Sequence, residues 1–239
     1  MNPSSIGPKG PPTAHNEQTL AHLLGRVFQD IGRDPAAYIW AGVPASVLST
    51  FLLVWSMLLG VGYAGLILVN SGETDTATDL WFVVVIYGQF ACLLPLLFCA
   101  EIWTYRVIWM QLSGKKSIGL KSVLTAVKIS PFQTLVFSVV STVFLMVSIL
   151  LCCIPVLFYS LLRPLAVCLF IVEGLGPLRA YIGAVREFKD DFSYQFKTVG
   201  MGVLLNLSLS GIPVLGPALG YALSGAVHLK GYQERKALR

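Results

Sequence analysis

Residues 35–69 read PAAYIWAGVPASVLSTFLLVWSMLLGVGYAGLILV and contain no charged side chain. A helix needs about 20 apolar residues to cross the hydrocarbon core of a bilayer, so this stretch is long enough for one long or tilted span. Asp34 and Pro35 stand at its start, and an N-cap aspartate followed by proline at the first helical position is typical of a helix start. We therefore predict a transmembrane helix that begins at residue 35.

The whole chain has the composition of an integral membrane protein. Of its 239 residues, 55% are hydrophobic and 12% are charged, whereas a soluble domain carries about 25% charged residues. So few charges cannot cover the surface of a soluble globule, and disorder requires low hydrophobicity with high charge. The composition therefore excludes both a soluble enzyme and a disordered chain.

The apolar stretches predict the fold class: an all-α integral membrane bundle of six transmembrane helices. After the first span at 35–69, the remaining five are expected at about 80–112, 131–153, 155–173, 194–212 and 214–229. The transmembrane domain then covers residues 34–230. Residues 1–16, rich in proline and glycine, are expected to form a disordered tail, and residues 231–239 a basic cytosolic tail.

Three amphipathic segments are predicted to lie in the membrane interface as helices. In residues 17–33, apolar side chains recur from Leu20 to Ile31 at the spacing of one helical stripe, and polar side chains occupy the other face. Residues 113–130 and 174–191 are the second and third such segments, and the second is basic. A basic amphipathic helix suits contact with anionic lipids, so we expect the phospholipid bilayer itself as a partner, with anionic lipids on the cytosolic face.

The positions of the charges predict the orientation. If the amino terminus is inside, the outer loops are residues 71–79, the CCIP turn and the GIPVLGP turn, and none of them contains Lys or Arg. All 17 Lys and Arg residues then lie on the cytosolic side or within a span, as the positive-inside rule requires. We therefore expect a multi-pass protein of a cytoplasmic (inner) membrane with both termini in the cytosol.

A repeat is visible in three stretches that align without gaps. FQDIGRDPAAY begins at residue 28, LTAVKISPFQT at 124 and VREFKDDFSYQ at 185. A helix-capping residue occupies the same place in each, namely Asp34, Ser130 and Asp191. This pattern predicts a unit of one interfacial helix and one transmembrane hairpin, used three times; the alternative is that any interfacial helix before a span produces the same pattern. Each hairpin crosses the membrane twice and returns the chain to the side from which it started. The three units would therefore share one orientation, unlike the inverted repeats of many transporters.

The second half of the chain resembles a known family. Residues 154–155 are Ile-Pro at the start of a span, residues 173–174 are Glu-Gly at its end, and the amphipathic segment RAYIGAVREFKDDF follows. In these features residues 110–239 resemble an uncharacterised bacterial six-helix membrane family, which includes the membrane domain attached to some glycerophosphodiester phosphodiesterases. The chain departs from that family at Ala184 and Val185, where members usually have Ser-Trp. The resemblance implies the topology and no settled activity.

Polar residues inside the spans are candidates for a binding site, because burying a charge in a membrane costs at least about 2.5–3.5 kcal/mol. Arg163 lies eight residues past Pro155, about 12 Å along a helix. Gln89 and Asn206 are expected at a similar depth, so Arg163, Gln89 and Asn206 form a predicted midplane cluster. Its functional interpretation is a ligand-binding site for an anion or a headgroup; its structural interpretation is a set of hydrogen bonds that joins helices.

Other residues suggest contacts rather than chemistry. Glu101, Glu173 and Lys197 are predicted near the cytosolic interface as a charge cluster, which favours salt bridges over acid–base catalysis. Gly216, Gly220 and Ser224 form a small-residue row that predicts close packing, within the chain or in a homodimer. The Cys and His residues have no metal-ligand spacing, and no catalytic motif is present, so no catalytic residue, metal or other cofactor is expected.

Three functions remain from the sequence. The favoured one is a non-enzymatic membrane protein that organises lipids or partners with a membrane complex. A transporter for a small anionic solute or lipid, with Arg163 as its binding charge, is the first alternative. A membrane-embedded enzyme is the second alternative. No nucleic-acid partner is expected.

Overall fold

The computed structural model describes residues 13–69, 76–113, 130–151, 153–210 and 215–237. Within these ranges the chain is built of α-helices, in keeping with the predicted all-α fold class. In chain order the helices are α1 (Thr13–Arg33), α2 (Pro35–Val69), α3 (Thr76–Leu112), α5 (Pro131–Leu150), α6 (Cys153–Val172), α7 (Pro177–Asp190), α8 (Phe192–Ser210) and α9 (Leu215–Ala237).

Four described segments are long and apolar enough to cross a membrane: α2, α3, α5 and Pro155–Val172 of α6. They correspond to the first four spans predicted from the sequence. Helices α8 and α9, which correspond to the fifth and sixth, are less apolar and are not among the four. The structure therefore supports a multi-pass membrane protein, and the count of six spans stays a prediction.

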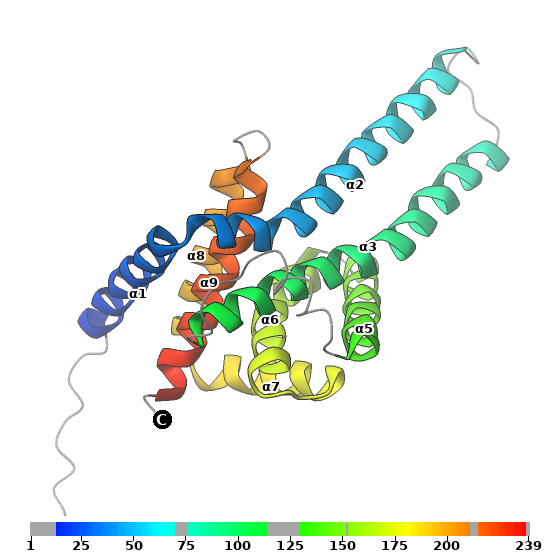
Figure 1. The fold of residues 1–239 in the computed structure, drawn as a ribbon. Helices are drawn as coiled ribbons and strands as arrows, with labels where there is room; N and C mark the ends of the chain where they lie inside the picture. The colour runs from blue at the N-terminus through cyan, green and yellow to red at the C-terminus, as the bar shows by residue number, and fades with distance from the viewer. Residues whose placement is uncertain (1–12, 70–75, 114–129, 152, 211–214, 238–239) are drawn as a thin grey trace, which may run out of the picture.

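Helices α2 and α3 lie side by side and extend as a hairpin beyond the other helices (Figure 1). In this part of α2 the side chains are largely exposed and apolar, such as Val61 and Leu68. Contacts between the two helices hold the hairpin together: Tyr63 stacks on Phe82 with ring centroids 3.9 Å apart and donates a hydrogen bond to Asp79. An exposed apolar hairpin without other packing is stable only in a lipid environment, which agrees with the length of the two helices.

Helix α9 occupies the centre of the bundle and packs against α2, α3 and α8 through small residues. A Cβ added at Gly42 of α2 would overlap the carbonyl oxygen of Ala218 in α9. A Cβ added at Gly220 of α9 would lie 2.6 Å from the Asn206 side chain of α8. Glycine at these positions lets the helix backbones approach closely, and van der Waals packing of this kind is a main source of helix association in membranes.

Charged contacts attach α1 to the end of α9. Arg26 lies 2.5 Å from Glu234, and Lys230 forms an ion pair with Asp30. Leu23 and Val27, on the same face of α1 as these charges, are buried in the core. Helix α1 therefore packs on the membrane domain through its apolar stripe and is tied to it by charge pairs that the sequence did not predict.

The turn between α6 and α7 depends on one glycine. Gly174 has φ of +66°, a left-handed conformation that L side chains adopt at an energetic cost. It follows Glu173, whose N–H is bonded to the Leu169 carbonyl 3.1 Å away as the last turn of α6 ends. The chain then turns sharply into α7, which crosses the end of α6 (Figure 1).

Two of the three predicted capping residues form a side-chain hydrogen bond to the helix that follows. Asp34 accepts a hydrogen bond from the Ala37 N–H at 3.2 Å, and Asp191 accepts one from the Tyr194 N–H at 3.3 Å. Each bond joins the capping residue to the residue three positions on, as an N-cap requires. Ser130 stands at the N-cap of α5 without a side-chain cap bond.

Several predicted segments lie wholly or partly outside the described residues. They are most of the tail at 1–16, the outer loop at 71–75, most of the basic segment at 113–130, Cys152 of the CCIP turn and residues 211–214 of the GIPVLGP turn. The first interfacial helix begins at Thr13 rather than at the predicted residue 17, so residues 13–16 are helical instead of part of the tail.

Candidate functional site

Arg163 of α6 lies inside the bundle and pairs with Glu101 of α3. The guanidinium Nη2 is 2.5 Å from the Glu101 Oε2, and both side chains are only 13% exposed. The Arg163 guanidinium also lies over the Phe98 ring, 3.8 Å from its centroid. Phe98 and Glu101 are three residues apart on α3, so one face of this helix supplies both the carboxylate and the aromatic ring.

This pairing neutralises the predicted anion-binding charge. An unpaired arginine in a membrane is costly, and a hydrogen-bonded carboxylate offsets much of that cost. The ring face adds a further favourable contact with the cation. In the described structure Arg163 therefore joins α6 to α3, and its charge is not free to attract an anionic solute.

Tyrosines surround one side of the ion pair. Tyr159 lies one helical turn before Arg163 on α6, and Tyr181 approaches from α7, with its hydroxyl 2.8 Å from the Ser141 hydroxyl of α5. The Tyr159 hydroxyl and the Arg163 Nε are buried without a hydrogen-bond partner among the described residues. Tyr159 and Tyr181 could not be predicted as part of this cluster, because aromatic residues at helical spacing carry no distinctive signal.

A second polar contact lies one helical turn further along α3. Tyr105, one turn after Glu101, has its hydroxyl 2.5 Å from the His228 Nδ1 of α9. The other ring nitrogen of His228 faces Gly202 of α8 and has no partner among the described residues. The contact joins residues that are 123 positions apart, so sequence spacing could not have revealed it. It joins α9 to α3 at the centre of the bundle.

The structure does not bring the predicted midplane cluster together. Gln89 donates a hydrogen bond to Ser56 at 3.3 Å, within the α2–α3 hairpin, and it lies twelve residues from Glu101, about 18 Å along α3. Asn206 packs against Gly220 of α9. Arg163 has Glu101 and Phe98 as neighbours. Residues at a similar depth on separate helices need not be neighbours, because depth does not determine the direction in which each side chain points.

The predicted interfacial charge cluster is also divided. Glu173, just past the end of α6, accepts hydrogen bonds from the Tyr232 hydroxyl at 2.5 Å and from the Lys236 ammonium at 2.9 Å. Glu101 lies in the bundle with Arg163, and Lys197 is exposed on α8. The Tyr232 hydroxyl and the Lys236 ammonium hold the pKa of the Glu173 carboxyl below its usual range. Glu173 thus ties the end of α6 to α9.

The small-residue row of α9 faces other helices of the same chain. Gly216, Gly220 and Ser224 are all buried. Gly220 lies against Asn206, and a Cβ added at Gly202 would lie 3.0 Å from the Ser224 hydroxyl. In the described residues this row therefore packs against α8.

Helix α7 presents an outer face of basic and apolar side chains. Leu178, Ile182 and Val185 are exposed on it, with Ile182 at 65%. The basic residues of this face, also exposed, are Arg179, Arg186 and Lys189. None of the three forms an ion pair with another described residue. An exposed helix face with free cations among large apolar side chains is typical of a membrane interface.

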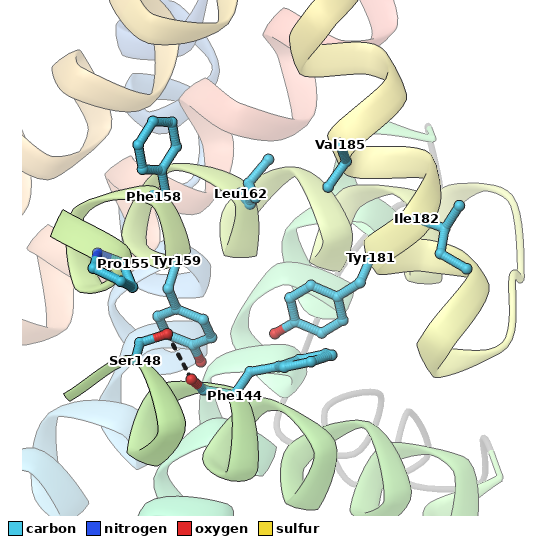
Figure 2. Close-up of a pocket in the computed structure, with 9 residues that line it drawn as sticks. All are labelled: Phe144, Ser148, Pro155, Phe158, Tyr159, Leu162, Tyr181, Ile182 and Val185. Carbon is cyan, nitrogen blue, oxygen red and sulfur yellow. Dashed lines mark hydrogen bonds between the residues drawn. The ribbon is translucent and has the colours of Figure 1, made fainter. Parts of the chain in front are cut away.

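A groove of about 490 Å³ runs beside this face, between α5, α6 and α7. Figure 2 shows its floor, where the Tyr159 ring from α6 and the Tyr181 ring from α7 approach Phe144 of α5. Among the described residues, no three His, Cys, Asp or Glu side chains are grouped to hold a metal ion.

Comparison with family profiles, curated proteins and solved structures finds no match for this chain, so its function must be argued from its own residues.

Proposed function

We propose that the chain is a non-enzymatic multi-pass membrane protein that binds anionic phospholipids at the cytosolic face of the membrane. The observation that carries this proposal is the outer face of α7, where Arg179, Arg186 and Lys189 lie among exposed apolar side chains and form no ion pair with another described residue. The apolar side chains enter the bilayer surface, and the cations attract lipid phosphates, each contributing about 1 kcal/mol near an anionic surface.

The membrane topology in this proposal has six spans. Helices α2 and α3, α5 and α6, and α8 and α9 form three consecutive hairpins. The shared capping geometry of Asp34 and Asp191 supports the idea that each hairpin follows an interfacial helix and that the unit is repeated. The distribution of Lys and Arg supports an orientation with the interfacial helices and both termini in the cytosol, in a bacterial-type inner membrane.

The transport alternative has less support. It required Arg163 as a free binding charge, and Arg163 is paired with Glu101 and covered by Phe98. The resemblance to the six-helix membrane family agrees with the proposed topology, and it adds no activity.

A thermal-shift experiment on the purified full-length protein tests the proposal. We compare the increase in Tm on adding phosphatidylglycerol with the increase on adding phosphatidylcholine, for the parent chain and for a triple Arg179→Gln, Arg186→Gln, Lys189→Gln variant. Binding to the folded state raises Tm, so phosphatidylglycerol should stabilise the parent chain more. The triple variant should lose about 3 kcal/mol of that preference, at about 1 kcal/mol for each cation.

Two controls make the result specific. Lys197→Gln removes a single exposed lysine of α8 and should lower the preference by no more than about 1 kcal/mol, a third of the loss in the triple variant. Added salt should weaken the preference, since exposed charges are screened within about 8–10 Å at physiological ionic strength. Equal stabilisation of the parent chain by the two lipids would refute the proposal.

A further inference from the structure

The groove between α5, α6 and α7 is lined almost entirely by apolar atoms. Its walls include Phe144 and Ser148 of α5, Pro155 and Tyr159 of α6, and Ile182 and Val185 of α7 (Figure 2). Its volume of about 490 Å³ is within the range of about 300–1,000 Å³ of small-molecule sites. Both α5 and Pro155–Val172 of α6 are candidate spans, so the surroundings of the groove are lipid.

One polar group in the groove lacks a partner. Tyr159 is 8% exposed, and its hydroxyl has no hydrogen-bond partner among the described residues. The neighbouring Tyr181 hydroxyl is bonded to Ser141 at 2.8 Å.

The groove has a cationic end and an apolar end. Helix α7 crosses α6 near Leu169, where a Cβ added at Gly183 would be 3.1 Å from the Leu169 side chain. From there the groove extends along α6 toward Pro155 and along α5 toward Ser148, close to the α5–α6 turn. At the α7 end, Lys189 lies one helical turn after Val185, which lines the groove, and is therefore its neighbour on the helix face.

This order of groups matches one kind of molecule in the bilayer. We propose that the groove holds an acyl chain of an anionic glycerophospholipid from the cytosolic leaflet. Its phosphate lies against the cations of α7, and its chain runs along α6 past Tyr159 toward Pro155 and Ser148. The inference rests on the proposed function, because it takes α7 to lie at the cytosolic surface.

The experiment measures how much lipid stays bound to the full-length protein. The protein is reconstituted in vesicles with equal amounts of phosphatidylcholine and phosphatidylglycerol, extracted gently, and analysed by native mass spectrometry for the lipid that remains. The parent chain should retain a phospholipid, with phosphatidylglycerol enriched over its share in the vesicle.

Two variants, each with a matched control, separate the parts of the site. Ile182→Trp places a large ring at the groove, and Leu207→Trp is its control on α8, because both parent side chains are 65% exposed. We expect Ile182→Trp to lose the bound lipid and Leu207→Trp to keep it. Lys189→Gln should reduce the enrichment of phosphatidylglycerol, and Lys197→Gln should not.

The outcomes distinguish this inference from the proposed function. Equal lipid retention by Ile182→Trp and Leu207→Trp would overturn the groove site, even if phosphatidylglycerol still raised the Tm of the parent chain. Retained lipid without enrichment of phosphatidylglycerol would overturn the anionic ligand; if phosphatidylglycerol then also failed to raise the Tm selectively, the proposed function would fall as well. A similar Tm for all variants without added lipid shows that any loss of lipid is not a loss of fold.

Discussion

The pair of Arg163 and Glu101 explains how an arginine can lie inside this bundle. The carboxylate supplies the opposite charge, and the Phe98 ring covers the guanidinium. A pair of this kind is costly to break, because either partner alone is a buried, unpaired charge. Its role in the described structure is to hold α6 against α3.

Breaking the pair from either side should destabilise the protein by about 3–5 kcal/mol. Arg163→Met leaves the Glu101 carboxylate unpaired, and Glu101→Leu leaves the guanidinium unpaired. The double variant removes both charges and should recover most of the lost stability, since buried pairs are often replaceable by apolar side chains. Chemical unfolding of the four proteins in detergent measures this coupling, and simple addition of the two single effects would contradict the account.

The stability contributed by Glu173 should depend on pH. Because Tyr232 and Lys236 lower the pKa of its carboxyl, the ionised form favours the folded state. This contribution is complete above the usual carboxyl pKa of 4.5 and is lost as the pH falls through the lower folded value. The difference in Tm between the parent chain and Glu173→Gln should therefore be constant around neutral pH and shrink below about pH 4.5. If the difference in Tm between the two proteins grew on acidification, the stabilising contacts of Glu173 with Tyr232 and Lys236 would be contradicted.

The sequence identified the important charges more readily than their partners. Arg163 could be selected because it is a charged residue within an apolar stretch. Glu101 could not be assigned to it, because counting residues along α3 gives a depth and does not show which neighbouring helix a side chain faces. The contact of Tyr105 with His228 is of the same kind, since it depends on the packing of α3 against α9.

Among the helices, the amphipathic ones were the most predictable, and the spans were less so in their packing. The apolar stripe of α1 includes Leu23 and Val27, which are buried as the periodicity predicts. The outer part of the α2–α3 hairpin extends away from the bundle (Figure 1), which hydropathy alone does not reveal. Hydropathy reports which segments avoid water, whereas the packing between them depends on small residues and on individual contacts.

The close approach of α2 and α9 gives a prediction with a matched control. Gly42→Ala places a methyl group against the Ala218 carbonyl, so the helices must move apart, and we expect a loss of about 1–3 kcal/mol. Gly60→Ala lies in the protruding part of α2, where an added Cβ meets nothing within 4 Å, and it should be neutral or slightly stabilising. Unfolding experiments give the free energy of unfolding of both variants. Equal losses of stability would contradict the close packing of α2 against α9.

For the molecule as a whole, the proposed orientation places the connection between α2 and α3 outside and the end of α9 in the cytosol. In a chain whose five native cysteines are replaced, Thr76→Cys should react with a membrane-impermeant maleimide added to intact cells. Ala237→Cys should react only after the membrane is opened. Labelling of both positions in intact cells would refute the placement of the two ends.

The central claim is that α7 lies on the cytosolic surface and binds anionic lipids. Hydrogen exchange of residues 177–190 in nanodiscs tests it most directly, with phosphatidylglycerol discs compared with phosphatidylcholine discs. Slower exchange in phosphatidylglycerol, lost in the triple Arg179→Gln, Arg186→Gln, Lys189→Gln variant, is the result that we predict. The same exchange rate for α7 in both lipids would contradict the account.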